Sequence, residues 1–213
     1  MASLVSKEKA VKVWQILRKA YSKAKYYLNF SNPLELLVAA ILSAQARDEV
    51  VNAATVELFK KFKSAQDYAK ASVEEIIKCI KNISFAGNKA RNIKAACEIL
   101  VKKFGGKVPK TMEELTALPG IGRKTAIVIL TNAYGIVPGV VVDTHVIRVA
   151  YRLGWTDQKN PEKIEQDLNA LLPKKLWKET QWILKAHGRA VCRAPYPFCS
   201  KCLVNKICPK RGV

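Results

Sequence analysis

The sequence is poor in acidic residues. Its 213 residues include 17 Asp and Glu against 37 Lys and Arg, a formal net charge of +20 at pH 7. Residues 1–31 contain seven basic residues and one acid, Glu8, and the chain after Glu179 contains seven basic residues and no acid. This excess favours a polyanionic partner, and its presence at both ends favours nucleic acid over a membrane surface.

Long apolar runs are also absent. No run approaches the roughly 20 residues that a membrane-spanning helix requires, and we see no signal peptide at the start. Hydrophobic residues still make up 49% of the chain, enough for a full globular core. We therefore expect a cytoplasmic, nucleoid-associated monomer without a membrane partner.

No stretch rich in Pro, Gly or Ser divides the chain, and no internal repeat is visible. Apolar residues recur at helical spacing, for example over residues 10–24. Helix-start signals follow, with Asn32 before a proline and capping boxes that begin at Ser72 and Thr111. The strand-like run 140–142 is too short to pair. We predict an all-α fold of roughly ten helices with short connections.

Residues 118–126, LPGIGRKTA, are typical of a helix-hairpin-helix. A helical run stops at Pro119, two glycines turn the chain, and a second helix begins. Gly120 and Gly122 can take positive φ and leave the first amides of that helix uncovered, where they and the helix dipole attract phosphate. With Arg123, these glycines are candidate DNA-backbone contacts, although an ordinary corner between helices is the alternative. A nucleotide-binding P-loop is excluded because it requires Gly directly before Lys.

Two residues are candidates for chemistry. Lys124 falls in the first turn of the second helix, where the dipole disfavours a positive charge. A lysine amine without its proton is a nucleophile that can form a Schiff base with a sugar aldehyde. Asp143 follows 19 residues later, in the motif VDTH. It can cap a new helix and still present a carboxylate to a cleft, and spacing alone does not choose between these roles.

Four of the six cysteines lie within 17 residues near the end of the chain: Cys192, Cys199, Cys202 and Cys208. Disulfides are disfavoured without a secretion signal. Zinc sites usually use two C-x2-C pairs and this segment has one, whereas iron–sulfur clusters accept four unevenly spaced thiolates. Spacing alone leaves both metals open. Cys79 and Cys97 lie on helical stripes and are expected in the core.

Together, the hairpin, the VDTHV motif and the four cysteines resemble the endonuclease III family of base-excision DNA glycosylases. The resemblance runs from about Asn32 to Cys208. It implies a helical-barrel domain over 27–136, with the helix-hairpin-helix near 113–133. It also implies a second domain, formed by 1–26 and 137–213, in which the four cysteines hold a [4Fe–4S] cluster. The active site would lie in the cleft between the two domains.

The resemblance further implies the activity. Such enzymes remove oxidised pyrimidines, such as thymine glycol, from duplex DNA and then cleave the abasic site by β-elimination. Lys124 would be the nucleophile and Asp143 would assist its deprotonation and stabilise positive charge on the sugar. Gln45 would fill the gap left by the flipped nucleotide. Phe85 would be a second wedge, although this chain has Ser84 and Ala86 where relatives have Gly and an aromatic residue, and a core position is the alternative.

Arg193, Lys201 and Lys206, near the cysteines, are candidate phosphate contacts by the same resemblance. One rival is a monofunctional mismatch glycosylase of the same fold, which generally lacks Lys at the place of Lys124. A more distant rival is a non-catalytic DNA-binding or iron–sulfur redox protein. The interval between Lys124 and Asp143 is one residue longer than in close bacterial relatives, which could shift the substrate range. His145 and His187 are expected to be structural.

Overall fold

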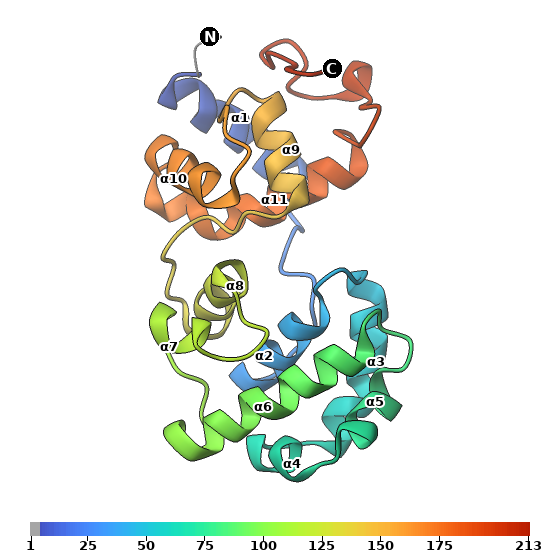
Figure 1. The fold of residues 1–213 in the computed structure, drawn as a ribbon. Coiled ribbons are helices and arrows are strands. Elements are labelled where there is room, and N and C mark those ends of the chain that lie inside the picture. Colours follow the sequence, from blue (N-terminus) through green and yellow to red (C-terminus); the bar gives the residue numbers. More distant parts are fainter. Residues whose placement is uncertain (1–4) are drawn as a thin grey trace. The chain divides into compact units, whose positions relative to one another are not determined.

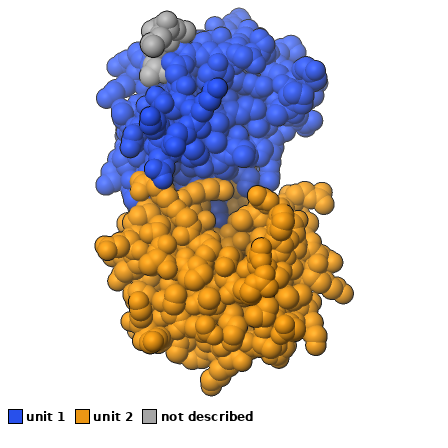
Figure 2. Space-filling view, viewed as in Figure 1, with its two compact units in different colours: residues 1–26, 137–213 blue, residues 27–136 orange. Residues whose placement is uncertain are grey.

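The computed structural model describes residues 5–213, in which eleven α-helices and two short 3-10 helices alternate with connections (Figure 1). The chain folds as two compact units (Figure 2). Unit 1 is Met1–Tyr26 with Val137–Val213, and unit 2 is Tyr27–Ile136. The described part of the chain contains no strand, which confirms the all-α prediction. Within residues 5–213, every helix is too short or too polar to cross a membrane.

Unit 2 is built around a buried helix and a long one. Its helices are α2 (Pro33–Leu42), α3 (Asp48–Lys61), α4 (Ala65–Lys70), α5 (Val73–Ile80), α6 (Ala86–Phe104), α7 (Met112–Thr116) and α8 (Arg123–Tyr134). The predicted start of α2 is confirmed, since the Asn32 side chain accepts a hydrogen bond from the Glu35 amide at 3.0 Å. Every residue of α2 from Leu36 onward is buried. Helix α6 packs against α2, α4 and α5, and α2 packs against α8.

Unit 1 joins the two ends of the chain, as Figure 1 shows. Its helices are α1 (Lys7–Ala20), α9 (Thr144–Arg152), α10 (Pro161–Leu171) and α11 (Trp177–Ala190), with 3-10 turns at Lys174–Leu176 and Cys199–Lys201. Trp14 of α1 donates its indole N–H to Thr180 of α11 at 3.0 Å. Gly188 lets α11 approach α9, since a Cβ there would lie 3.0 Å from the His145 ring. Residues 140–142 are a buried connection, not a strand.

Candidate active-site residues and a four-cysteine cavity

The glycines of the hairpin 118–126 have different roles. Gly120 has a φ of +80°, and a Cβ there would lie 3.1 Å from the Asn92 side chain of α6, so the turn requires glycine. Gly122 has a φ of −92°, so the predicted positive φ at that position is wrong. As the N-cap of α8 in extended backbone, Gly122 offers no side-chain oxygen to the first amides of the helix. These amides remain uncovered by a cap, as an anion site requires.

Lys124 is the second residue of α8 and is exposed, as is its neighbour Arg123. Lys124 therefore lies in the first turn of α8, where the backbone amides are uncapped. The positive end of the helix dipole lies there, which favours an anion such as a phosphate. The start of α8 thus combines uncapped backbone amides with an exposed primary amine.

The carboxylate of Asp143 is held by three donors. Its Oδ1 accepts hydrogen bonds from the amides of His145 and Val146, each at 2.9 Å, which confirms that Asp143 caps α9. Its Oδ2 accepts a hydrogen bond from Nε2 of Gln181, on α11, at 2.8 Å. The side chain is half-buried. These bonds from two helices fix the orientation of the carboxylate while leaving part of it accessible.

Gln45 and Phe85 share an uncommon backbone conformation. Gln45, between α2 and α3, has a φ of 52°, and Phe85, the N-cap of α6, has a φ of 60°. The left-handed region costs a non-glycine residue roughly 1–3 kcal/mol, and such residues gather at functional sites. Both side chains are exposed, and Phe85 is 63% exposed. The core alternative for Phe85 is therefore wrong, and both residues can reach a ligand.

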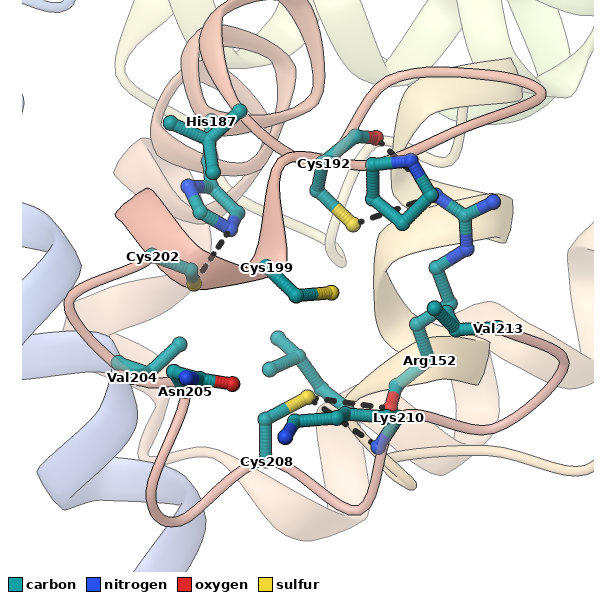
Figure 3. Close-up of a pocket in the computed structure, with 13 residues that line it drawn as sticks. Arg152, His187, Cys192, Cys199, Cys202, Val204, Asn205, Cys208, Lys210 and Val213 are labelled. Carbon is teal, nitrogen blue, oxygen red and sulfur yellow. Dashed lines mark hydrogen bonds between the residues drawn. The ribbon is translucent and has the colours of Figure 1, made fainter.

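The four predicted metal ligands line one cavity in unit 1. Cys192, Cys199, Cys202 and Cys208 come from the segment after α11 and surround a common space with His187 and Arg152 (Figure 3). Burial raises the pKa of the Cys202 and Cys208 thiols, so these groups keep their protons unless a metal stabilises the thiolates. Among residues 5–213, no group of His, Cys, Asp and Glu is gathered closely enough to hold a metal ion. The four cysteines nonetheless line one cavity (Figure 3).

Polar groups around the cavity point toward the sulfurs. Arg152 donates from Nη1 to Cys192 Sγ at 3.5 Å, and the Lys210 amide donates to Cys208 Sγ at 3.4 Å. His187 Nε2 lies 3.7 Å from Cys202 Sγ, and burial lowers the pKa of His187 to about 4, so its ring is neutral near pH 7. Arg152 also donates to the carbonyls of Arg193 and Pro195, which fastens the cysteine segment to α9.

Basic residues of the cysteine segment gather at its surface. The Arg193 guanidinium and the Lys201 ammonium lie 5.2 Å and 6.0 Å from the centre of the Phe198 ring. Both cations are exposed.

The other two cysteines were predicted to lie in the core. Cys97 is fully buried, whereas Cys79 is half-buried.

Residues 38–174 match the model of the HhH-GPD superfamily of base excision DNA repair proteins. Endonuclease III of Synechocystis sp. is 45% identical to this chain over 95% of it and 93% of the relative. Endonuclease III of Escherichia coli K12 is 38% identical over 96% of each chain. The chain belongs to the endonuclease III family.

Solved structures agree with this assignment. An endonuclease III trapped as a covalent intermediate with DNA is 37% identical to this chain, with a TM-score of 0.92 and 97% of both chains covered. A thermostable thymine-DNA glycosylase, at 24% identity and a TM-score of 0.84, shares the fold. The predicted family and helix-hairpin-helix glycosylase fold are confirmed. This endonuclease III family member is a base excision repair enzyme of the DNA glycosylase and abasic-site lyase type.

Sequence reasoning missed Gln181, because a glutamine within a helical stripe carries no local signal. Gln181 is 5% exposed, and no other residue in the described part of the chain bonds its Oε1. A buried amide with one unsatisfied atom costs stability, and here its other end orients the Asp143 carboxylate. Gln181 and Asp143 are 38 residues apart in the sequence, so no local motif predicts this pair.

Gln181→Met should slow base excision by about tenfold to a hundredfold, the scale of one hydrogen bond to a charged group. Methionine keeps the length of the side chain but cannot orient Asp143. The measurement is the single-turnover excision rate in the parent and in an Asp143→Asn background. Because the effect passes through Asp143, the substitution should cost little in that background. Equal losses of excision rate in both backgrounds would show that Gln181 contributes packing and does not act through Asp143.

Proposed function

We propose that this enzyme is a bifunctional DNA glycosylase that removes oxidised pyrimidines, such as thymine glycol, from duplex DNA and then cleaves the strand at the abasic site. The observation that carries this proposal is the exposed amine of Lys124 on the helix end with uncapped amides. A related endonuclease III trapped covalently on DNA supports it, since such trapping requires a protein nucleophile.

The reaction proceeds in two stages. The Lys124 amine attacks C1′ of the flipped nucleotide, and the bond from C1′ to the base breaks, so the base leaves with the bonding electrons and gains a proton. Opening of the sugar ring gives a Schiff base between Lys124 and C1′. Loss of a proton from C2′ then expels the 3′ phosphate by β-elimination. Asp143 assists deprotonation of Lys124 and stabilises positive charge on the sugar.

Two kinds of contact bind the DNA: backbone contacts that do not depend on sequence, and side chains that fill the gap left by the flipped base. The amides after Gly120 and Gly122, with Arg123, hold a DNA phosphate without reading bases. A base inside the stack is beyond the reach of a nucleophile, and its extrusion costs a few kcal/mol. Gln45 and Phe85, exposed and in strained backbone, fill the gap in the duplex and lower that cost.

The four-cysteine cavity fits a [4Fe–4S] cluster. It provides four sulfur donors around one space, with N–H groups of Arg152 and Lys210 directed at two of them. When bound, the cluster would cross-link the segment that carries Arg193 and Lys201, so that these cations keep a fixed position toward DNA phosphates. Cys192, Cys199, Cys202 and Cys208 would be its ligands.

Cys199→Ser should remove the iron and, with it, much of the DNA affinity. The purified parent is expected to contain about four iron atoms and equivalent sulfide per chain. Cys79→Ser, in unit 2 and outside the cavity, should keep the full iron content. The measurements are iron and sulfide analysis, visible absorption and affinity for duplex DNA. Stoichiometric zinc in place of iron would contradict the cluster.

Incubation with a duplex that contains one thymine glycol tests the activity. The parent protein should release the base, nick the strand and, when borohydride is added, form a permanent protein–DNA adduct. Base release without a nick or adduct would instead identify a monofunctional glycosylase. An iron-loaded protein that forms no adduct on either thymine glycol or an abasic site would contradict the lyase proposal.

A further inference from the structure

Helix α6 connects three segments to which the proposed function gives a DNA contact. It begins directly after Phe85, and its residue Asn92 lies under Gly120 of the hairpin. Between these two points, Lys89 reaches the loop that contains Gln45. All of these residues belong to unit 2. The position of α6 therefore determines the spacing of the hairpin and the two strained residues.

The Lys89 ammonium is buried and bonded to two backbone carbonyls. The residue is 5% exposed, and its Nζ donates to Leu42 O at 2.8 Å and to Ala44 O at 2.6 Å. Burial lowers the pKa of Lys89. The carbonyls at the end of α2 carry the negative end of the helix dipole, which offsets part of the cost of burying a cation. The two hydrogen bonds fix the end of α2 and the residue before Gln45 against α6.

A main-chain hydrogen bond, independent of the Lys89 side chain, also links Lys89 to Phe85, the other non-glycine residue of unit 2 with positive φ. The Lys89 amide donates to the carbonyl of Phe85 at 3.1 Å, in the first turn of α6. One residue therefore bonds the carbonyl of Phe85 through its backbone and the carbonyl that precedes Gln45 through its side chain. Of these partners, Phe85 has a positive φ and Ala44 directly precedes Gln45, which also has one.

We propose that Lys89 is a positioning residue for base extrusion: it holds the Gln45 loop against α6 so that Gln45 and Phe85 enter the duplex at a fixed separation. Lys89 does not itself touch the DNA, since it is buried in unit 2. This inference rests on the proposed function, in which Gln45 and Phe85 fill the gap in the duplex.

The same helix provides a matched control. Lys94 Nζ donates to Ala69 O at 2.5 Å and to Ala71 O at 2.9 Å, at the end of α4. It also pairs with Glu98 at 3.3 Å. Lys94 thus makes the same kind of contact as Lys89, one lysine to two carbonyls, but in a segment without any proposed DNA contact. Substitution of Lys94 reports the cost of losing such a contact in general.

The test compares Lys89→Met with Lys94→Met on two duplexes. One contains thymine glycol paired with adenine, and the other contains a preformed abasic site, where no base has to be unstacked. Lys89→Met should lower the single-turnover excision rate about a hundredfold, the scale of a displacement of about 1 Å in a catalytic site. Borohydride trapping on the abasic duplex should fall much less. Lys94→Met should stay near the parent on both duplexes.

A second readout does not depend on catalysis. In a duplex with a stable abasic analogue, 2-aminopurine opposite the analogue changes its fluorescence when a side chain fills the gap. The parent and Lys94→Met should give the change, whereas Lys89→Met should lose it, as should Gln45→Ala. If the parent gives this fluorescence change but excises no base, the proposed function is refuted. The fluorescence of the Lys89 and Lys94 variants then still tests the positioning role of Lys89. Lys89→Arg, which keeps a cation but moves its donors, replaces Lys89→Met if the latter does not fold.

Two results would overturn the role of Lys89. One is an equal loss for the Lys89 and Lys94 variants, which would make both contacts simply structural. The other is that Lys89→Met lowers the rate equally on both duplexes, or does not lower it on either. Lys89 would then have no role in base extrusion. In a Gln45→Ala background, Lys89→Met should cost less than in the parent, because the side chain that it positions is already gone.

Discussion

Lys124→Gln should eliminate the borohydride-trapped adduct and lower strand cleavage by a factor on the order of 10⁴ to 10⁶, the scale of removing a covalent nucleophile. Glutamine is unbranched and polar and position 124 is exposed, so α8 and the hairpin should fold as before. An amide nitrogen has no basic lone pair and cannot attack C1′. The measurements are single-turnover nicking and gel detection of the adduct on thymine glycol and abasic duplexes.

Arg123→Gln is the control for the loss of charge. Arg123 immediately precedes Lys124 on α8 and is also exposed. Its substitution removes one cation from the same helix end and should weaken DNA binding while the adduct still forms. Lys124→Gln should bind DNA nearly as well as Arg123→Gln does. Full nicking by the Lys124 variant would refute its assignment as the nucleophile and leave it a phosphate contact.

The features that the sequence predicted correctly are local ones. The helix start at Asn32 and the cap at Asp143 each depend on residues within three or four positions. The start at Asn32 occurs as predicted, and the cap at Asp143 is one of the two roles that the sequence left open. The four cysteines are close in sequence, so their common cavity also needed little long-range information. Helix starts can be predicted from sequence because the first backbone amides of a helix must find acceptors nearby.

The features that sequence reasoning missed depend on contacts between distant segments. Lys89 reaches a carbonyl 45 residues away, and Gln181 reaches Asp143 across 38 residues. Neither residue type in a helix predicts its partner. The positive φ expected at Gly122 was wrong because a glycine can also adopt extended backbone, and here it serves as a cap without a side chain. The exposure of Phe85 likewise depends on where the preceding loop places it.

Asp143→Asn should lower base excision by roughly 10² to 10⁴, the range of a group that assists proton transfer. The substitution separates the two roles of this residue. Asparagine is as good an N-cap as aspartate, so its amide oxygen can still accept from the amides of His145 and Val146 and α9 should remain stable. The negative charge, however, is lost. Single-turnover excision and thermal unfolding of the same preparations measure the two effects.

Glu162→Gln provides the comparison, since Glu162 is an exposed acid in the first turn of α10, in the same unit as Asp143. It removes one negative charge from a helix start without any proposed part in the chemistry, and its excision rate should match the parent. If Asp143→Asn kept the parental rate, Asp143 would be a helix cap only, and the deprotonation of Lys124 would have to be assigned to another group. If the variant instead lost stability along with activity, the cap would be the cause. A large loss of rate at unchanged stability is the result that makes the charge of Asp143, and not its hydrogen bonds to α9, necessary for excision.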